Sequence, residues 1–290
     1  MEITHQDVEA NGLRFHVALC GPDSGPPVIL LHGFPEFWGG WAVHMPRLAA
    51  QGYRVIAPDL RGYGTSDKPA RVKDYALERM VEDITGILDT LGHPTALVVG
   101  HDWGGALAWE VARAAPERVQ RLVVINCPPF DAMRSAPLRD PLQPFRSWYI
   151  LAFQLPFLPQ WSSSLWNHKL LCSIMIRSAQ PGTFSNTSLA AHREAWSNPD
   201  ALRSMIHWYR AALRCPPKSG RRITVPALLL WGEKDRFLGT SLIAPTEALC
   251  DSLQVVRFPD NTHWLPHEAP EAVVTQIVQF FSGSGDPVGD

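Results

Sequence analysis

Disulfide chemistry, membrane-spanning segments and strong charge are all lacking in this 290-residue sequence. The five cysteines are odd in number and scattered, without a Cys-x-x-Cys pair, which argues against a disulfide framework and a thiolate metal site. No apolar run approaches the ~20 residues that are needed to cross a bilayer. The first residues lack the basic start and the apolar segment of a signal peptide. These absences favour a globular protein of a reducing compartment, and we expect it in the cytoplasm.

Neither sign of charge is in excess. Lysine and arginine number 26, aspartate and glutamate number 28, and the formal net charge is −2. Such a chain offers no basic field to nucleic acid or to an anionic membrane, and we expect neither as a partner. Apolar residues make up 46% and charged residues 19%, which is ample material for a core. The length allows one large domain, or a core with one smaller unit. We expect a monomer or a homodimer.

Six short runs rich in valine, isoleucine and leucine alternate with helical patterns. They cover residues 28–31, 54–57, 96–99, 121–125, 227–230 and 253–256. Continuous apolar strands separated by helices predict an α/β fold with a mostly parallel central sheet, covered by helices on both faces. Ligands of such sheets bind beyond the carboxyl ends of the strands.

The strand pattern stops between about residues 131 and 221. This segment is rich in tryptophan, phenylalanine, leucine and proline, and it has the pattern of several short helices. We interpret residues 131–221 as a helical cap, inserted into a core formed by residues 1–130 and 222–290. Its aromatic content favours a pocket roof over the strand ends, and the alternative is a helical extension packed elsewhere.

Residues 100–105 read Gly-His-Asp-Trp-Gly-Gly and directly follow the apolar run 96–99. A small residue on either side of a central residue, between a strand and a helix, is the layout of a nucleophile elbow. Asp102 takes the place where esterases and lipases hold serine. An aspartate that attacks a saturated carbon forms an ester, which water can cleave, whereas serine would form a stable ether. Asp102 thus predicts displacement at an sp3 carbon, although an aspartate here could also merely cap the following helix.

Two further candidates complete a catalytic triad with Asp102. Asp235 follows the run 227–230, and His263 follows the last run. The order nucleophile, acid and histidine is that of the α/β-hydrolase architecture. Glu233 is a rival acid in the same loop. His263 and His267 lack the His-Glu-x-x-His sequence of a zinc site, so we expect neither a metal nor another cofactor.

An ester intermediate also needs an oxyanion hole, which backbone N–H groups can form. Phe34 and Trp103 are the expected donors, because one follows an early strand and the other follows the nucleophile. Gly33 permits a close approach of the backbone. His32 precedes the nucleophile in the chain and is expected to brace its loop, while His101 is expected to point away from the substrate.

At these residues the chain resembles the α/β-hydrolase-fold epoxide hydrolases, over nearly its whole length. The loop 32–36, His-Gly-Phe-Pro-Glu, and the loop 59–69, which begins Asp-Leu-Arg-Gly-Tyr-Gly, resemble signature loops of that family. Two cap tyrosines of the family hydrogen-bond the epoxide oxygen. One lies in a Trp-Tyr segment before a Phe-Gln pair, and the other lies in an aromatic-Tyr-Arg segment. The resemblance implies these roles for Tyr149 and Tyr209.

The resemblance implies hydrolysis of an epoxide to a vicinal diol in two steps. Asp102 would attack a ring carbon while Tyr149 and Tyr209 stabilise the departing oxygen, since a phenol is a suitable acid for an alkoxide. His263, oriented by Asp235, would then activate water against the ester. The expected partners are therefore a small apolar epoxide and water.

The aromatic residues of the cap favour an apolar substrate, and we expect Trp148, Phe153 and Trp208 to contact it. Haloalkane dehalogenases are the nearest alternative, because they share the Asp–His–acid machinery and bind halide through an indole at the position of Trp103. They often place asparagine where this chain has Phe34. Haloacid enzymes of the fluoroacetate type hold substrate through arginines that are missing after Asp102. A non-catalytic binding protein on a hydrolase scaffold is the remaining alternative.

Overall fold

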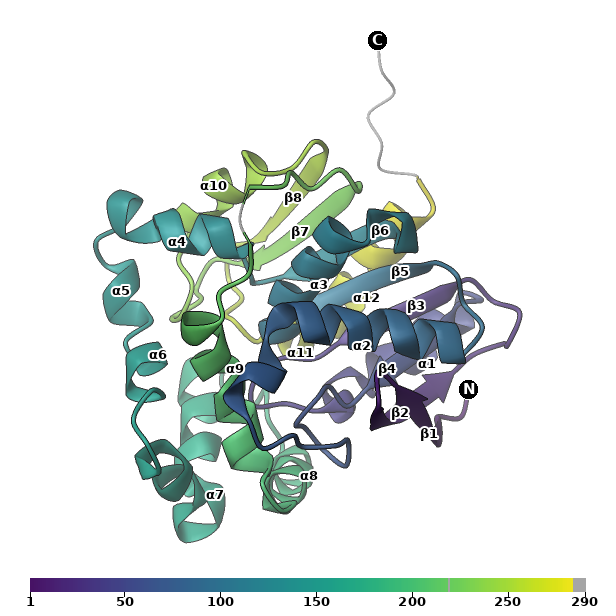
Figure 1. Ribbon diagram of the computed structural model, residues 1–290. Helices are drawn as coiled ribbons and strands as arrows, with labels where there is room; N and C mark the ends of the chain where they lie inside the picture. Colours follow the sequence, from purple (N-terminus) through teal and green to yellow (C-terminus); the bar gives the residue numbers. More distant parts are fainter. Residues whose placement is uncertain (219, 284–290) are drawn as a thin grey trace.

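An eight-stranded sheet forms the centre of the computed structural model, which describes residues 1–218 and 220–283 (Figure 1). Its strands are β1 (Thr4–Ala10), β2 (Leu13–Cys20), β3 (Pro27–Leu31), β4 (Arg54–Pro58), β5 (Ala96–His101), β6 (Val119–Ile125), β7 (Ala227–Gly232) and β8 (Leu253–Phe258). They lie in the order β1-β2-β4-β3-β5-β6-β7-β8. The strands from β3 to β8 pair in parallel, whereas β1 and β2 pair antiparallel at one edge.

The six predicted strands and the mostly parallel sheet are confirmed. Strands β5 and β7 are buried along their whole length, which explains their uninterrupted apolar sequences. The sequence pattern did not reveal β1 and β2. Strand β1 lies at the sheet edge and buries only Val8 and Ala10, so it lacks a continuous apolar run.

Helices cover both faces of the sheet. On one face, α2 (Leu77–Thr90) and α3 (Trp103–Ala114) pack together, and on the other, α1 (His44–Ala50) contacts α12 (Pro270–Phe281). The shorter helices of the core are α10 (Ile243–Glu247) and α11 (Leu265–Glu268), with the 3₁₀ helices η1 (Trp38–Trp41), η2 (Val72–Tyr75), η3 (Pro116–Arg118) and η4 (Thr240–Leu242). Among the described residues, no helix is long and apolar enough to cross a membrane.

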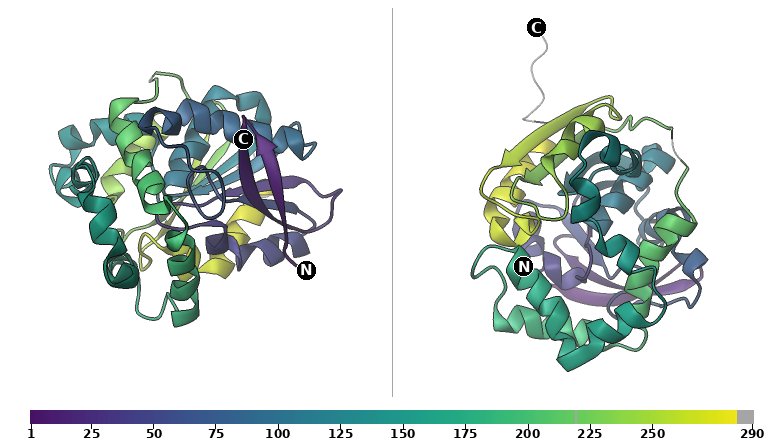
Figure 2. Two further views of the ribbon diagram at one scale, coloured as in Figure 1. Left: turned by 60° about the horizontal axis from the view of Figure 1, so that its bottom comes forward. Right: turned by 90° about the vertical axis from the view of Figure 1, so that its left-hand side faces the viewer.

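Between β6 and β7 the described chain is helical, and we call this segment the cap. It contains α4 (Phe130–Arg139), α5 (Gln143–Arg146), α6 (Tyr149–Ala152), α7 (Leu158–Ser178), α8 (Asn186–Ser197) and α9 (Ala201–Arg214). The backbone of α7 leaves helical geometry at residues 165–168. Figures 1 and 2 show the cap helices gathered on one side of the sheet. The predicted boundaries at 131 and 221 stay a prediction, and residues 219 and 284–290 lie outside the described residues.

The sheet has a point where the direction of chain progression reverses. The chain leaves β3 toward β4 on one side, and it returns to β5 on the other side of β3. The loops that follow β3 and β5 therefore diverge, and ligands of parallel α/β sheets bind in the resulting crevice. Phe34 follows β3 and Asp102 follows β5, so both lie at this crevice.

Candidate active site

Asp102 occupies a sharp turn between β5 and α3, with φ of 52° and ψ of −121°. Positive φ strains a residue that has a Cβ, and such strain is found at functional sites. The turn requires glycine at two positions, because glycine has no Cβ. A Cβ at Gly100 would overlap the backbone of Gly104, and a Cβ at Gly104 would overlap the carbonyl of Leu31. The Asp102 side chain makes no capping hydrogen bond to α3, which removes the helix-cap interpretation.

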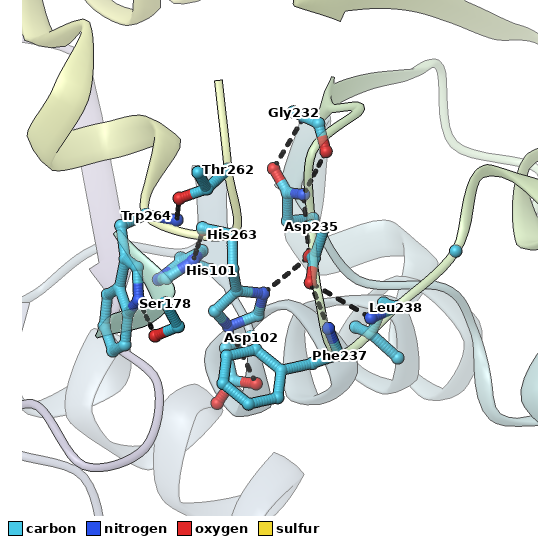
Figure 3. A network of polar contacts seen from close by, with 12 residues as sticks. His101, Asp102, Ser178, Gly232, Asp235, Phe237, Leu238, Thr262, His263 and Trp264 are labelled. Atoms are coloured by element: carbon cyan, nitrogen blue, oxygen red, sulfur yellow. Dashed lines mark hydrogen bonds and ion pairs between the residues drawn. The ribbon is translucent and has the colours of Figure 1, made fainter. Parts of the chain in front are cut away.

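The structure brings the three predicted triad residues together (Figure 3). His263 Nδ1 lies 2.7 Å from Asp235 Oδ2, and His263 Nε2 lies 3.5 Å from Asp102 Oδ2. The rival Glu233 instead pairs with Arg257 at 3.2 Å. The parallel strands β5, β7 and β8 end at one edge of the sheet, and this shared edge places the three side chains within reach of one another.

Asp235 is fixed by three hydrogen bonds besides its contact with His263. Its Oδ1 accepts from the backbone N–H groups of Phe237 and Leu238 at 2.7 and 3.0 Å. Its Oδ2 accepts from Asn126 Nδ2 at 2.9 Å. Asn126, which directly follows β6, was missed in the sequence analysis. Its position just past a buried strand is the signal that could have identified it.

A second polar group lies behind His263. The carbonyl oxygen of His263 lies 2.8 Å from His101 Nε2, and His101 Nδ1 lies 3.2 Å from Glu36 Oε2. His267 Nε2 contacts the other oxygen of Glu36 at 2.5 Å. Burial alone would raise the pKa of Glu36, but His267 and His101 hold it well below its usual range. The ionised carboxylate of Glu36 thus holds the backbone at His263 in place through His101. His101 points away from the cavity, as expected.

The charges around His263 favour an ion pair in the resting site. Burial by itself lowers the pKa of His263, but the carboxylates of Asp235 and Asp102 outweigh it and raise the pKa to about 10. Burial likewise raises the pKa of Asp102, and the hydrogen bond and charge of His263 reverse this and lower it. At neutral pH the resting site therefore holds a protonated His263 beside two carboxylates. The carboxyl group of Asp102 is therefore ionised.

One of the two expected oxyanion donors already contacts the nucleophile. The backbone N–H of Phe34 donates to Asp102 Oδ1 at 2.7 Å. A Cβ at Gly33 would overlap the Asp102 side chain, so glycine is what permits this approach. The N–H of Trp103 begins α3 beside the carboxylate but makes no hydrogen bond to it in the described chain. His32 lies in the same loop and accepts from the Leu60 N–H at 3.1 Å, which braces the loop as expected.

Two cavities meet above the nucleophile, one of about 620 Å³ and one of about 480 Å³. Both are lined by Asp102, Tyr149 and Tyr209, so the two tyrosines stand where the cavities join. The rings of Tyr149 and Tyr209 lie 5.9 Å apart between centroids. The predicted cap therefore roofs the strand ends, and the interpretation of an extension packed elsewhere is wrong.

Tyr149 lies on α6 and Tyr209 lies on α9, and two hydrogen bonds from side chains to backbone carbonyls join these parts of the cap. Gln154 Nε2 donates to the carbonyl oxygen of Tyr209 at 3.1 Å. Arg210 donates from Nε to the carbonyl of Phe153 at 2.9 Å. Burial raises the pKa of both phenols well above the usual value, and the Asp102 charge raises it further. Both hydroxyls thus keep their protons and can donate hydrogen bonds into the cavity.

Two of the three residues expected to contact the substrate line the larger cavity. These are Trp148 and Phe153. Trp208 lines neither cavity, so the expectation that it contacts the substrate is wrong. It is fully buried, its indole N–H donates to the carbonyl of Arg61 at 2.9 Å, and its ring packs 5.7 Å from that of Trp103. Trp208 therefore fastens α9 to the core, next to Tyr209.

An aspartate on a strand-to-helix elbow, beside a His–Asp pair from loops that follow later strands, is the arrangement of a class of hydrolase. The family described as alpha/beta hydrolase fold matches residues 26–270. The chain belongs to the α/β-hydrolase family.

Relatives in this family narrow the group further. Human "Epoxide hydrolase 4" is 36% identical, over 94% of this chain and 77% of the relative. The Bacillus subtilis "AB hydrolase superfamily protein YfhM" is 39% identical, over 94% and 96%. The solved structure of a Bacillus megaterium epoxide hydrolase with an inhibitor superposes with a TM-score of 0.86, at 27% identity, over 96% and 100%. These findings confirm the resemblance and place the enzyme among the epoxide hydrolases.

Proposed function

We propose that this enzyme hydrolyses an apolar epoxide to a vicinal diol through a covalent ester on Asp102. The observation that carries the proposal is an ionised carboxylate on a strained turn, with two protonated phenols lining the cavities above it. Ring opening needs a nucleophile on carbon and a hydrogen-bond donor on oxygen. The names of the relatives support the same reaction.

In the first step, Asp102 Oδ2 attacks a ring carbon and the bond from that carbon to the epoxide oxygen breaks. Asp102 Oδ1, which accepts from the Phe34 N–H at 2.7 Å, remains as the carbonyl oxygen of the ester. The phenols of Tyr149 and Tyr209 donate to the alkoxide as its charge develops. Desolvation in the cavity strengthens these hydrogen bonds relative to water.

The second step depends on a change in the charge of Asp102. The ester is neutral, so the ring of His263 loses one of the two carboxylates that raise its pKa. The pKa of His263 falls, and the imidazolium gives up the proton that neutralises the alkoxide. Neutral His263 then takes a proton from water as the water attacks the ester carbonyl, and this returns the diol, ionised Asp102 and protonated His263. Alkylation thus converts His263 from an ion-pair partner into a base.

A single turnover in ¹⁸O-labelled water, with enzyme in excess, tests the covalent route. The diol from the first turnover should carry no label, because its new oxygen comes from Asp102 Oδ2. The label should instead be found in a peptide that contains Asp102, by mass spectrometry. Label in the first diol would mean direct attack of water on the epoxide and would contradict the proposal. Halide release from alkyl halides, with no diol from epoxides, would assign a dehalogenase.

Replacement of Asp235 tests the charge argument through the pH dependence of turnover. Asp235→Asn removes a carboxylate that raises the pKa of His263. Because the neutral imidazole is the active form, the acid limb of kcat should move to lower pH. The plateau should fall by a factor on the order of 10² or more, because the imidazole loses its orientation. Glu233→Gln is the matched control, since Glu233 pairs with Arg257 and not with His263. An acid limb that stays in place in Asp235→Asn would refute the argument.

A further inference from the structure

Exposed apolar side chains are concentrated on one part of the cap. Of fifteen exposed large apolar residues in the described chain, twelve lie between residues 142 and 176. We call these twelve the outer face of the cap: Leu142, Phe145, Trp148, Leu151, Leu155, Phe157, Leu158, Trp161, Trp166, Leu170, Ile174 and Ile176. All five exposed aromatic residues of the described chain belong to it, and four of them are 66–83% exposed. A concentration of exposed apolar side chains in one segment favours an interaction surface over ordinary solvent-facing surface.

Residues 141–193, which carry this face, contain four basic residues and no aspartate or glutamate. Asp140, which flanks this segment, lies 3.7 Å from Arg146, but no carboxylate falls within the segment itself. Lys169 and Arg177 are exposed on α7, and among the described residues neither has an ion-pair partner. Arg177 lies on the same side of the helix as Leu170 and Ile174, seven and three positions earlier. A nearby carboxylate, Asp200, shares a shallow depression with Trp161 and is paired with Arg203 at 3.1 Å.

The outer face is continuous with the larger active-site cavity. Six of its residues line that cavity, together with Asp102 and His263 at its base: Phe145, Trp148, Leu155, Leu158, Leu170 and Ile174. The cavity wall also includes Arg146 and Arg236 but no carboxylate other than Asp102. In Figure 1 the helices α5, α6 and α7 form a column at the outer side of the cap, away from the sheet. An apolar molecule could therefore pass from this face to the nucleophile along apolar side chains.

We infer that the outer face of the cap docks on the surface of an anionic lipid bilayer. Exposed tryptophan and phenylalanine enter the membrane interface, and lysine and arginine beside them attract anionic headgroups. A second copy of the chain fits less well, because a two-fold contact would bring basic residues against basic residues without a carboxylate to pair them. The inference departs from the expectation of no membrane partner. That expectation came from net charge, which is a sum over the whole chain and does not describe one segment of it.

Flotation of the full chain with vesicles tests the inference. We expect binding to vesicles of phosphatidylcholine with phosphatidylglycerol, weaker binding to phosphatidylcholine alone, and weakening by salt. Phe157→Ser with Trp166→Ser should weaken binding about tenfold or more, because affinity scales with the apolar area that is buried. Lys169→Glu with Arg177→Glu should weaken it at least about thirtyfold, or roughly fivefold for each charge removed. None of these four residues lines either active-site cavity.

Matched controls replace exposed residues that do not belong to the outer face of the cap. Val43→Ser removes an exposed apolar side chain and Lys73→Glu reverses an exposed charge, and both variants should bind like the unmodified chain. Circular dichroism checks that every variant is folded. No binding to anionic vesicles, or equal binding by all variants, would overturn the inference. So would a dimer in light scattering that Phe157→Ser with Trp166→Ser dissociates. Vesicle binding does not depend on epoxide turnover, so this inference and the proposed function can fail separately.

Discussion

The His263→Gln variant, incubated with an apolar epoxide, is expected to gain the mass of the whole epoxide and to retain it. Asp102 loses the hydrogen bond and charge of His263, which lower its pKa, but it keeps the hydrogen bond from the Phe34 N–H, so it can still open the ring, more slowly than in the unmodified chain. Glutamine cannot take a proton from water, so the hydrolysis step loses its base. Loss of a general base costs a factor of about 10²–10⁴. The ester therefore accumulates, and intact-protein mass spectrometry measures it.

The same experiment separates the alternatives considered from the sequence. Asp102→Asn combined with His263→Gln is the control and should gain no mass. An alkyl halide panel that adds only the alkyl group, without an epoxide adduct, would move the assignment to a dehalogenase. If the unmodified chain binds both panels without turnover and no variant gains mass, the chain is a binding protein. Diol formation by His263→Gln at the unmodified rate would exclude the proposed base.

Replacement of both cap tyrosines should nearly abolish ring opening. Tyr149→Phe and Tyr209→Phe each remove one phenol from the junction of the two cavities. Loss of one donor to a developing oxyanion costs a factor of about 10²–10³, and the double variant should lose more than about 10³. The rate of ester formation, measured by rapid quenching and mass spectrometry, is the relevant quantity. Hydrolysis of an ester already formed should be affected much less.

Tyr53→Phe is the matched control for this pair. Tyr53 packs against Phe281 of α12, on the face of the sheet away from the cap helices, and its replacement should leave turnover unchanged. A double variant that forms the ester at the unmodified rate would show that the phenols do not assist ring opening. Binding of an unreactive diol should change little, which separates a catalytic defect from a collapsed cavity.

The sequence predicted most of the central site because its signals are local. Each triad residue lies in the loop that follows a parallel strand, and the parallel strands of a sheet end at one edge. The choice of Asp235 over Glu233 was also made from chain position, and it agrees with the 2.7 Å contact to His263. By contrast, Asn126 and Glu36 support the triad through contacts that join distant segments. The position of Asn126 just past a buried strand is a local signal, but it does not say which side chain Asn126 will contact.

Trp208 and Tyr209 show why the cap was harder to predict. Neighbouring residues of a helix point about 100° apart, so the two need not both face the cavity. Which one does so depends on how α9 docks, and the hydrogen bond from Trp208 to Arg61 fixes that. The exposed outer face is a similar case, because the same aromatic residues could have formed a buried roof. Composition cannot distinguish these arrangements, since both use apolar side chains.

The sequence by itself determined the succession of the six parallel strands and the type of residue at the elbow, because periodicity and turn chemistry act over a few residues. Only the tertiary structure decided which side chains meet, as in the ion pair around His263 and the two phenols at the junction of the cavities. It also decided which apolar side chains are exposed on the outer face of the cap. The physical reason is that charge interactions, burial and cavity shape depend on distances across the fold. Those distances are set by the packing of the cap on the sheet, which no single segment of the chain encodes.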